Sequence, residues 1–152
     1  MTDPATDRVG YMNMGYPSAC VSDENDQYPP EKGEAMTTAA LYTRLLMEEE
    51  LGKEPILKKH AELMRKKLPI LDVREFGTDM YYWYYGTCGM KRMGGVYWDT
   101  WNKAMKPAAL LSRHKDGHHA GSWDPNCACG LIGGRVYSTA MMVLCLEVYF
   151  RG

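Results

Sequence analysis

A recurring threonine pattern is the feature that most constrains the fold of this chain. The stretches MTTAAL, YGTCGM and YSTAMM each carry a threonine at the same place, followed by small and then larger apolar residues. These threonines, Thr38, Thr87 and Thr139, lie 49 residues (38 to 87) and 52 residues (87 to 139) apart. A period of about 50 residues is typical of a repeat architecture, in which each copy is one supersecondary unit. We therefore expect three equivalent elements around these threonines.

Apolar periodicity predicts two kinds of helix in alternation. Ile56–Leu68 and Tyr97–His114 are amphipathic, with one apolar stripe each, whereas Glu34–Met47 and Gly134–Phe150 are apolar nearly all round and should lie buried among other helices. Pro107 predicts a kink or an early end in the second amphipathic helix. The expected stripe of that helix comprises Trp98, Trp101, Met105, Ala108 and Leu111.

The run YYWYYG at residues 81–86 resembles a β-strand when taken alone, because aromatic side chains suit a pleated sheet. It overlaps the second copy of the threonine pattern, and the first and third copies are helical by periodicity. We therefore predict a helix here, with Asp79 as its N-cap. Gly86 and Gly89 would be points of close helix packing, which offsets the cost of about 1 kcal/mol for each glycine in a helix.

Length and charge exclude several classes of protein. The 152 residues suit one domain, and the net charge of -1 is not the basic footprint of a nucleic-acid binder. No apolar run approaches the roughly 18 residues of a membrane span, and no signal-peptide pattern is present. The odd count of five cysteines argues against a disulfide framework and favours a reducing compartment, the cytoplasm. Cys88 and Cys145 are expected to be buried as small apolar residues.

The segment DGHHAGSWDP, residues 116–125, resembles the aromatic-glycine loop of the prenyltransferase and squalene-oxidase repeat, which terpene cyclases and protein prenyltransferase β subunits contain. With DMYYWYYGT, W..WNKAM and GGRVYSTA...LEVYFR, the chain resembles a bacterial group of proteins with such repeats. That group is best known from planctomycete and myxobacterial genomes, and the function of most members is unassigned. The resemblance runs from about Thr2 to Arg151. It departs from the cyclases in having no D-x-D-D run, and Arg113 stands where the repeat usually carries glutamine.

Together these features predict an all-α fold, made of helical hairpins of an incomplete α/α toroid with about two and a half repeats. We expect one partial-toroid domain, 1–152, divided into a loop (1–33), a first repeat (34–69), a second repeat (78–114), a loop (115–133) and the inner helix of a third repeat (134–152). Closed toroids contain more hairpins, so the chain is expected to be a fragment or an open arc. An open arc would pair with further repeats of the same or a neighbouring chain, or associate with itself.

Seven side chains are candidates for binding a ligand. Aromatic rings around a cavity stabilise cations through their faces by roughly 0.5 to 2 kcal/mol each, and an arginine at a helix N-terminus binds carboxylate or phosphate. The alternatives are that the rings pack between helices and that Arg135 pairs with Asp124 or Glu147. The candidates are Tyr81, Tyr82, Trp83, Tyr85, Trp123, Arg135 and Tyr137.

The GSWDP stretch supplies the catalytic candidate. Asp124 would act as a general acid or a metal ligand. Alternatively, Trp123 packs over a helix end while Asp124 accepts backbone N–H bonds in the turn. Residue types that bind zinc lie within 12 residues around it. The Cys-x-Cys spacing is not the usual Cys-x-x-Cys spacing of zinc sites, so we favour no cofactor. The histidines are then expected to be exposed loop residues. The metal-ligand candidates are His118, His119, Asp124, Cys127 and Cys129.

The function predicted from the sequence is a non-catalytic repeat module. It would bind an apolar small molecule or a peptide, or pack against further repeats, with self-association and without nucleic-acid partners. The first alternative is an isoprenoid-active enzyme of the terpene cyclase or prenyltransferase type, with Asp124 at work. The second alternative is a zinc-binding loop.

Overall fold

The computed structural model describes residues 2–11, 13–16, 33–47, 55–71 and 78–150, and the chain is all-α within them, as predicted. Cys20 and the greater part of the predicted loop 1–33 lie outside the described residues, as do residues 151–152. A short 3-10 turn, η1 (Gly117–His119), lies between the last two helices. The described α-helices are α2 (Ala35–Met47), α3 (Pro55–Arg65), α4 (Met80–Met93), α5 (Gly95–Ser112) and α6 (Gly130–Glu147).

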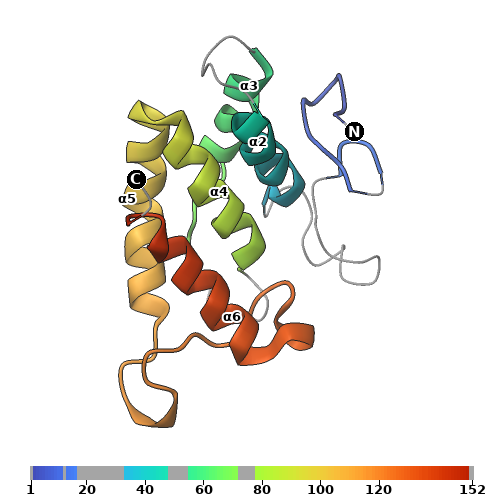
Figure 1. Cartoon of the computed structure of the whole chain (residues 1–152). Coiled ribbons are helices and arrows are strands. Elements are labelled where there is room, and N and C mark those ends of the chain that lie inside the picture. Colours follow the sequence, from blue (N-terminus) through green and yellow to red (C-terminus); the bar gives the residue numbers. More distant parts are fainter. Residues whose placement is uncertain (1, 12, 17–32, 48–54, 72–77, 151–152) are drawn as a thin grey trace.

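The helices form two layers, with α4 at the centre (Figure 1). One layer is a row of α2, α4 and α6, in which α4 separates the other two. The other layer is α3 and α5, which contact each other and both contact α4. The three repeated threonines all lie on the helices of the row, which alternate along the chain with the helices of the other layer. The prediction that α2 and α6 are buried among other helices is wrong in part, because both keep exposed apolar side chains, such as Met47 (79%) and Val136 (83%). Closure into a toroid stays a prediction.

The aromatic run forms the first half of α4. The Asp79 carboxylate caps the helix by accepting the Tyr82 N–H at 3.0 Å, as predicted, and the Gly94 N–H bonds the last carbonyls of the helix. Tyr82 and Trp83 are buried in the core, while the rings of Tyr81, Tyr84 and Tyr85 are half-buried. The run is helical because its rings have neighbours on several sides, which no single sheet face would provide.

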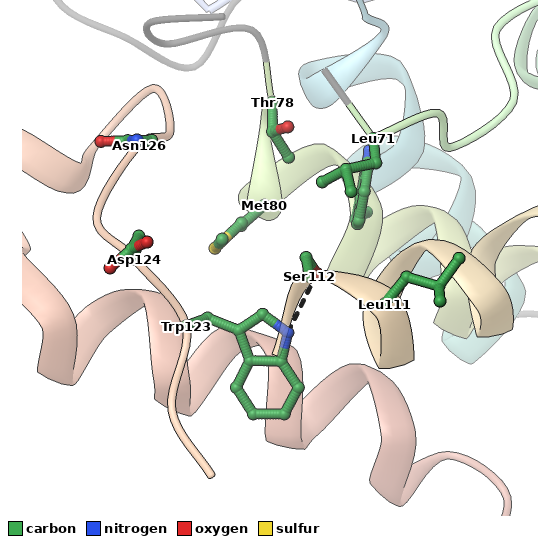
Figure 2. Close-up of a pocket in the computed structure, with 9 residues that line it drawn as sticks. Leu71, Thr78, Met80, Leu111, Ser112, Trp123, Asp124 and Asn126 are labelled. Carbon is green, nitrogen blue, oxygen red and sulfur yellow. Dashed lines mark hydrogen bonds between the residues drawn. The ribbon is translucent and has the colours of Figure 1, made fainter. Parts of the chain in front are cut away.

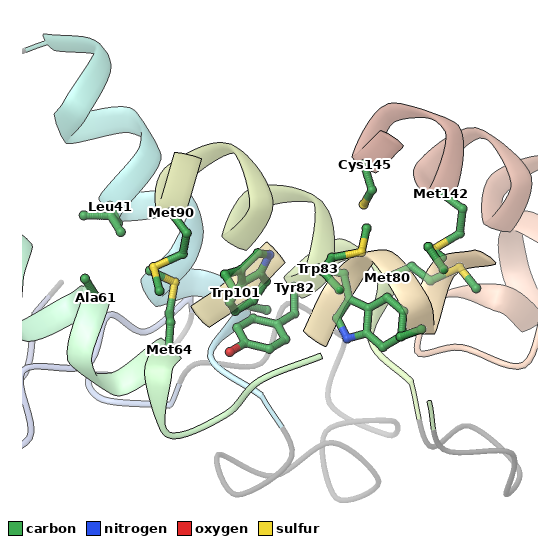
Figure 3. Packing of buried hydrophobic residues seen from close by; sticks show 14 of the residues in the cluster. Leu41, Ala61, Met64, Met80, Tyr82, Trp83, Met90, Trp101, Met142 and Cys145 are labelled. Carbon is green, nitrogen blue, oxygen red and sulfur yellow. The ribbon is translucent and has the colours of Figure 1, made fainter. Parts of the chain in front are cut away.

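Gly86 lets the indole of Trp101, which lies in the buried cluster of Figure 3, pack against the backbone of α4. A Cβ atom at Gly86 would lie 2.4 Å from Cζ2 and Cη2 of the Trp101 indole. The indole N–H donates to the Thr87 hydroxyl at 3.0 Å, and that hydroxyl donates to the Trp83 carbonyl at 2.6 Å. At Gly89 a Cβ atom would lie 3.2 Å from Leu41, on the neighbouring helix of the row. Both glycines are therefore points of close packing, as predicted.

The bounds of α5 and α6 differ from the sequence predictions, and of the two outcomes predicted at Pro107 the early end is wrong. α5 passes through Pro107 without ending there, because Pro107 and Lys103 are both exposed and water can bond the carbonyl that proline leaves without a donor. Leu111 is 69% exposed and leaves the predicted stripe; Ala109 is buried instead. α6 breaks at Gly134, whose φ of 60° and ψ of -164° suit only glycine, and it ends at Glu147 rather than Phe150.

The N-terminal segment packs on the first hairpin. The Arg8 guanidinium lies 2.9 Å from the buried carboxylate of Glu34, and the Val9 N–H donates to the Thr37 hydroxyl. Burial raises the pKa of Glu34, and the charge of Arg8 opposes that rise.

Cys88 and Cys145 are buried, as predicted. Among the described helices, none is both long and apolar enough to cross a bilayer.

Replacement of Gly86 by alanine tests the contact between the layers. Because the added methyl group collides with a buried indole, we expect Gly86→Ala to lower the free energy of unfolding by about 1 to 3 kcal/mol despite the better helix propensity of alanine. Urea unfolding followed by circular dichroism measures the change. Gly89→Ala is the matched control on the same helix: its methyl group would lie 3.2 Å from the Leu41 side chain, a smaller overlap, so the loss should be smaller than that of Gly86→Ala. Equal effects at both glycines would contradict this account.

Candidate functional site

A cavity of about 300 Å³ lies where α5 ends beside the start of α4 (Figure 2). Five of its nine lining residues are apolar and four are polar, so the cavity combines hydrophobic walls with groups that can form hydrogen bonds, as small-molecule sites do. Two predicted ligand-binding residues, Trp83 and Trp123, and the catalytic candidate Asp124 meet here. The lining comprises Leu71, Thr78, Met80, Trp83, Leu111, Ser112, Trp123, Asp124 and Asn126.

Trp123 joins the end of α5 to α6. Its indole N–H donates to the Ala109 carbonyl at 2.9 Å and lies 3.1 Å from the Ser112 hydroxyl oxygen, the bond drawn in Figure 2. Its backbone N–H donates to the Thr139 hydroxyl at 3.3 Å, and its carbonyl accepts from Ser138 at 2.8 Å. The prediction that Trp123 packs over a helix end is confirmed. The ring is therefore fixed in place as a wall of the cavity.

Asp124 is held by two side chains at the rim. Its Oδ1 accepts a hydrogen bond from the Arg135 guanidinium, and its Oδ2 lies 2.8 Å from His114 Nε2. Partial burial raises the pKa of Asp124, but the contacts with Arg135 and His114 outweigh burial and leave that pKa lowered. The partners are side chains rather than the backbone N–H groups expected from the turn. The predicted contact between Arg135 and Asp124 is present.

Asp79, between the cavity residues Thr78 and Met80, is a buried carboxyl group that sequence reasoning treated only as a cap. Burial raises its pKa from 3.8 to about 6, although the backbone N–H groups of Tyr82 and Tyr81 partly oppose that rise. At neutral pH Asp79 is thus ionised, although its apolar surroundings disfavour the charged form. It makes the start of α4 sensitive to pH.

The tyrosines of α4 form a separate ring cluster outside the cavity lining. Tyr85 is in contact with Tyr81 (ring centroids 4.6 Å apart), Tyr84 (4.9 Å) and Tyr42 of α2 (6.3 Å). Tyr82 is only 2% exposed, and its hydroxyl donates to the backbone carbonyl of Lys67. Tyr82 is therefore a core residue. Tyr42 was not predicted as a member of this cluster, because it lies on α2, outside the aromatic run.

The remaining candidates lie in and after the loop between α5 and α6. His118 and His119 are exposed, as favoured from the sequence, whereas Cys127 is buried, which raises the pKa of its thiol to about 12. Tyr137 is half-buried beside Cys129, and burial raises the pKa of its hydroxyl. Within the described ranges, no three His, Cys, Asp or Glu side chains are grouped so that they could hold a metal ion. The zinc-binding alternative stays a prediction.

Several lining residues had no signal in the sequence. Leu71 and Asn126 reach the cavity only because the fold brings their segments together. Met80 follows the Asp79 cap, so its place at the helix start could have been anticipated. Ser112 ends α5, and a hydroxyl there is a common bonding group for a nearby N–H.

Comparisons with known proteins do not identify this site. No protein-family model, curated protein or solved structure matches the chain. The function is therefore argued from the geometry of the chain itself.

Replacement of Asp79 by asparagine tests the buried charge. At about pH 8 we expect Asp79→Asn to raise the free energy of unfolding by about 1 to 3 kcal/mol, because the amide oxygen still accepts the Tyr82 N–H but buries no charge. The folded chain binds this proton more tightly than the unfolded chain, so the wild type loses stability as the pH rises from about 4 to about 6.

Urea unfolding of both proteins across that pH range measures the difference. Below about pH 4 both states of the wild type are protonated, and the gain from the substitution should vanish. Asp99→Asn, at an exposed position of α5, is the matched control and should change little at any pH. A gain from Asp79→Asn that does not depend on pH would be incompatible with a buried carboxylate.

Proposed function

We propose that this chain is a non-catalytic helical-repeat module that binds an apolar group in the cavity between Trp83 and Trp123. The observation that carries the proposal is the cavity itself, whose volume of about 300 Å³ lies at the lower end of the range for small-molecule sites. Its two indole rings are fixed by the packing of α4 and by the bonds of Trp123. A rigid apolar wall lowers the entropy lost when a ligand binds.

The rim defines the chemistry of the ligand. Asp124 is the one charged residue among the described lining; the Arg135 guanidinium already balances its charge, and His114 occupies its second oxygen. A charged ligand would have to displace one of these partners. We infer a neutral and mostly hydrocarbon ligand, with few polar groups that bond to Thr78, Ser112 or Asn126. A short isoprenoid chain or an aromatic ring meets this description.

The family resemblance supports the same class of ligand. The GSWDP stretch, which resembles the aromatic-glycine loop of the prenyltransferase and squalene-oxidase repeat, contributes Trp123 and Asp124 to the lining. Proteins with such repeats include terpene cyclases, whose substrates are isoprenoids. The resemblance is to a family of repeats and does not specify the ligand.

The alternative is an isoprenoid-active enzyme in which Asp124 acts as the acid. The paired geometry argues against that role, because a carboxyl group with a lowered pKa holds no proton to donate near neutral pH. Turnover of squalene or a prenyl diphosphate that Asp124→Asn abolishes would favour the enzyme.

A thermal-shift experiment tests the binding proposal. Farnesol, a neutral isoprenoid alcohol, is the probe; at a hundredfold excess over its Kd we expect the Tm to rise by about 5 to 10 °C. Leu111→Asp places a charge in the lining and should abolish the rise. Leu110→Asp changes the adjacent residue of α5, which is also exposed but does not line the cavity, and should preserve it. A rise of equal size in both variants would place the ligand elsewhere, and no rise with farnesol or dodecanol would refute the proposed ligand class.

A further inference from the structure

The helices of the row share a register that is set by their threonines. In each helix, the residues three before, one after and four after the threonine form a stripe, here called the forward face. The forward face of α2 includes Tyr42, whose ring contacts Tyr85 of α4. The forward face of α4 includes Lys91, whose ammonium group donates to the Val148 carbonyl at the end of α6. In both cases the forward face meets the next helix of the row.

The forward face of α6 meets no helix of the described chain. It comprises Val136, Ala140 and Val143, which are apolar and exposed, Val136 to 83% and Val143 to 50%. Ile132, which precedes the break at Gly134, is 78% exposed. The corresponding positions of α2 and α4 are buried or half-buried, whereas those of α6 are apolar and exposed, which indicates an interaction surface.

The opposite edge of the row presents the complementary surface. In each helix, the residues two before and two after the threonine belong to a second stripe, here called the backward face. On α4 these residues are Tyr85 and Gly89, and both contact α2, the preceding helix of the row. On α2 the same positions are Met36 and Ala40, which are half-buried, and the stripe continues through Thr43 to Met47, which is 79% exposed. Ala40 occupies the register position of Gly89, the close-approach point between α2 and α4.

We propose that the forward face of α6 docks on the backward face of α2 in a second copy of this chain. The contact continues the row of α2, α4 and α6 and repeats the interface that already joins these helices. It needs no new type of packing, since both faces are apolar and both stand in the register used inside the chain. Because two different faces meet, the contact is heterologous, and each copy keeps one free edge unless the assembly closes. This inference does not depend on the ligand of the cavity.

Sedimentation velocity of three proteins tests the contact. The wild type at micromolar concentration should sediment with a mass of two chains or more. The α6 variant carries Val136→Lys and Val143→Lys, and the α2 variant carries Thr43→Lys and Met47→Lys; each alone should sediment as a monomer. All four positions are exposed, so the fold should persist, which circular dichroism checks. Val96→Lys, at a position of α5 that is 56% exposed, is the control and should associate like the wild type.

Mixing the two variants gives the decisive result. The α6 variant keeps an intact α2 face and the α2 variant keeps an intact α6 face, so an equal mixture should form a dimer of one copy of each. A wild type that stays monomeric overturns the proposal. So does an α2 variant that still associates alone, because α6 would then pair with α6. A mixture of folded variants that stays monomeric also overturns it.

Discussion

The structure depends on the contact between Gly86 and the Trp101 indole, which sets the distance between the two layers. α4 has helices on several sides, and a glycine there lets a large ring from α5 approach its backbone. Because α5 is held at this distance, its last turn places Ser112 and the Ala109 carbonyl where the Trp123 indole N–H bonds them. The cavity is therefore a consequence of the same contact, since its walls are the end of α5, the start of α4 and Trp123.

The repeated threonines have a shared physical reason. Thr87 accepts the Trp101 indole N–H, and Thr139 accepts the Trp123 backbone N–H. In the first copy the bond shifts by one residue, since Thr37 accepts the Val9 N–H while the Thr38 hydroxyl bonds within its own helix. An N–H group that packs against the apolar helices of the row needs a hydrogen-bond acceptor there, because leaving a buried N–H unpaired costs about 1 to 3 kcal/mol. The hydroxyls of the row supply that acceptor without introducing a charge.

Those parts of the fold that follow from local chemistry could be predicted from the sequence. The stripes of the helices, the Asp79 cap and the two close-packing glycines each follow from spacing and residue type. The errors lie where the tertiary environment decides. The helix does not end early at Pro107 because that face is exposed, and Leu111 leaves the core because Trp123 already covers the end of α5. Arg135 was one predicted partner of Asp124, although the sequence left Glu147 as an alternative partner of Arg135, and His114 had no signal as a partner. Only the folded loop brings Arg135 and His114 to it.

The two edges of the row are not equivalent, and the reason lies in the N-terminal segment. In a stack of repeats each unit is stabilised by its neighbours, so an edge without a neighbour needs a cover. At α2, residues 2–11 bond to Glu34, Thr37 and Arg44, next to the backward face, and Met36 and Ala40 are half-buried. No described segment does the same at α6, where Val136 is 83% exposed. The free energy still available from burial is therefore concentrated on α6, while the backward face of α2 contributes mainly through its exposed residues Thr43 and Met47.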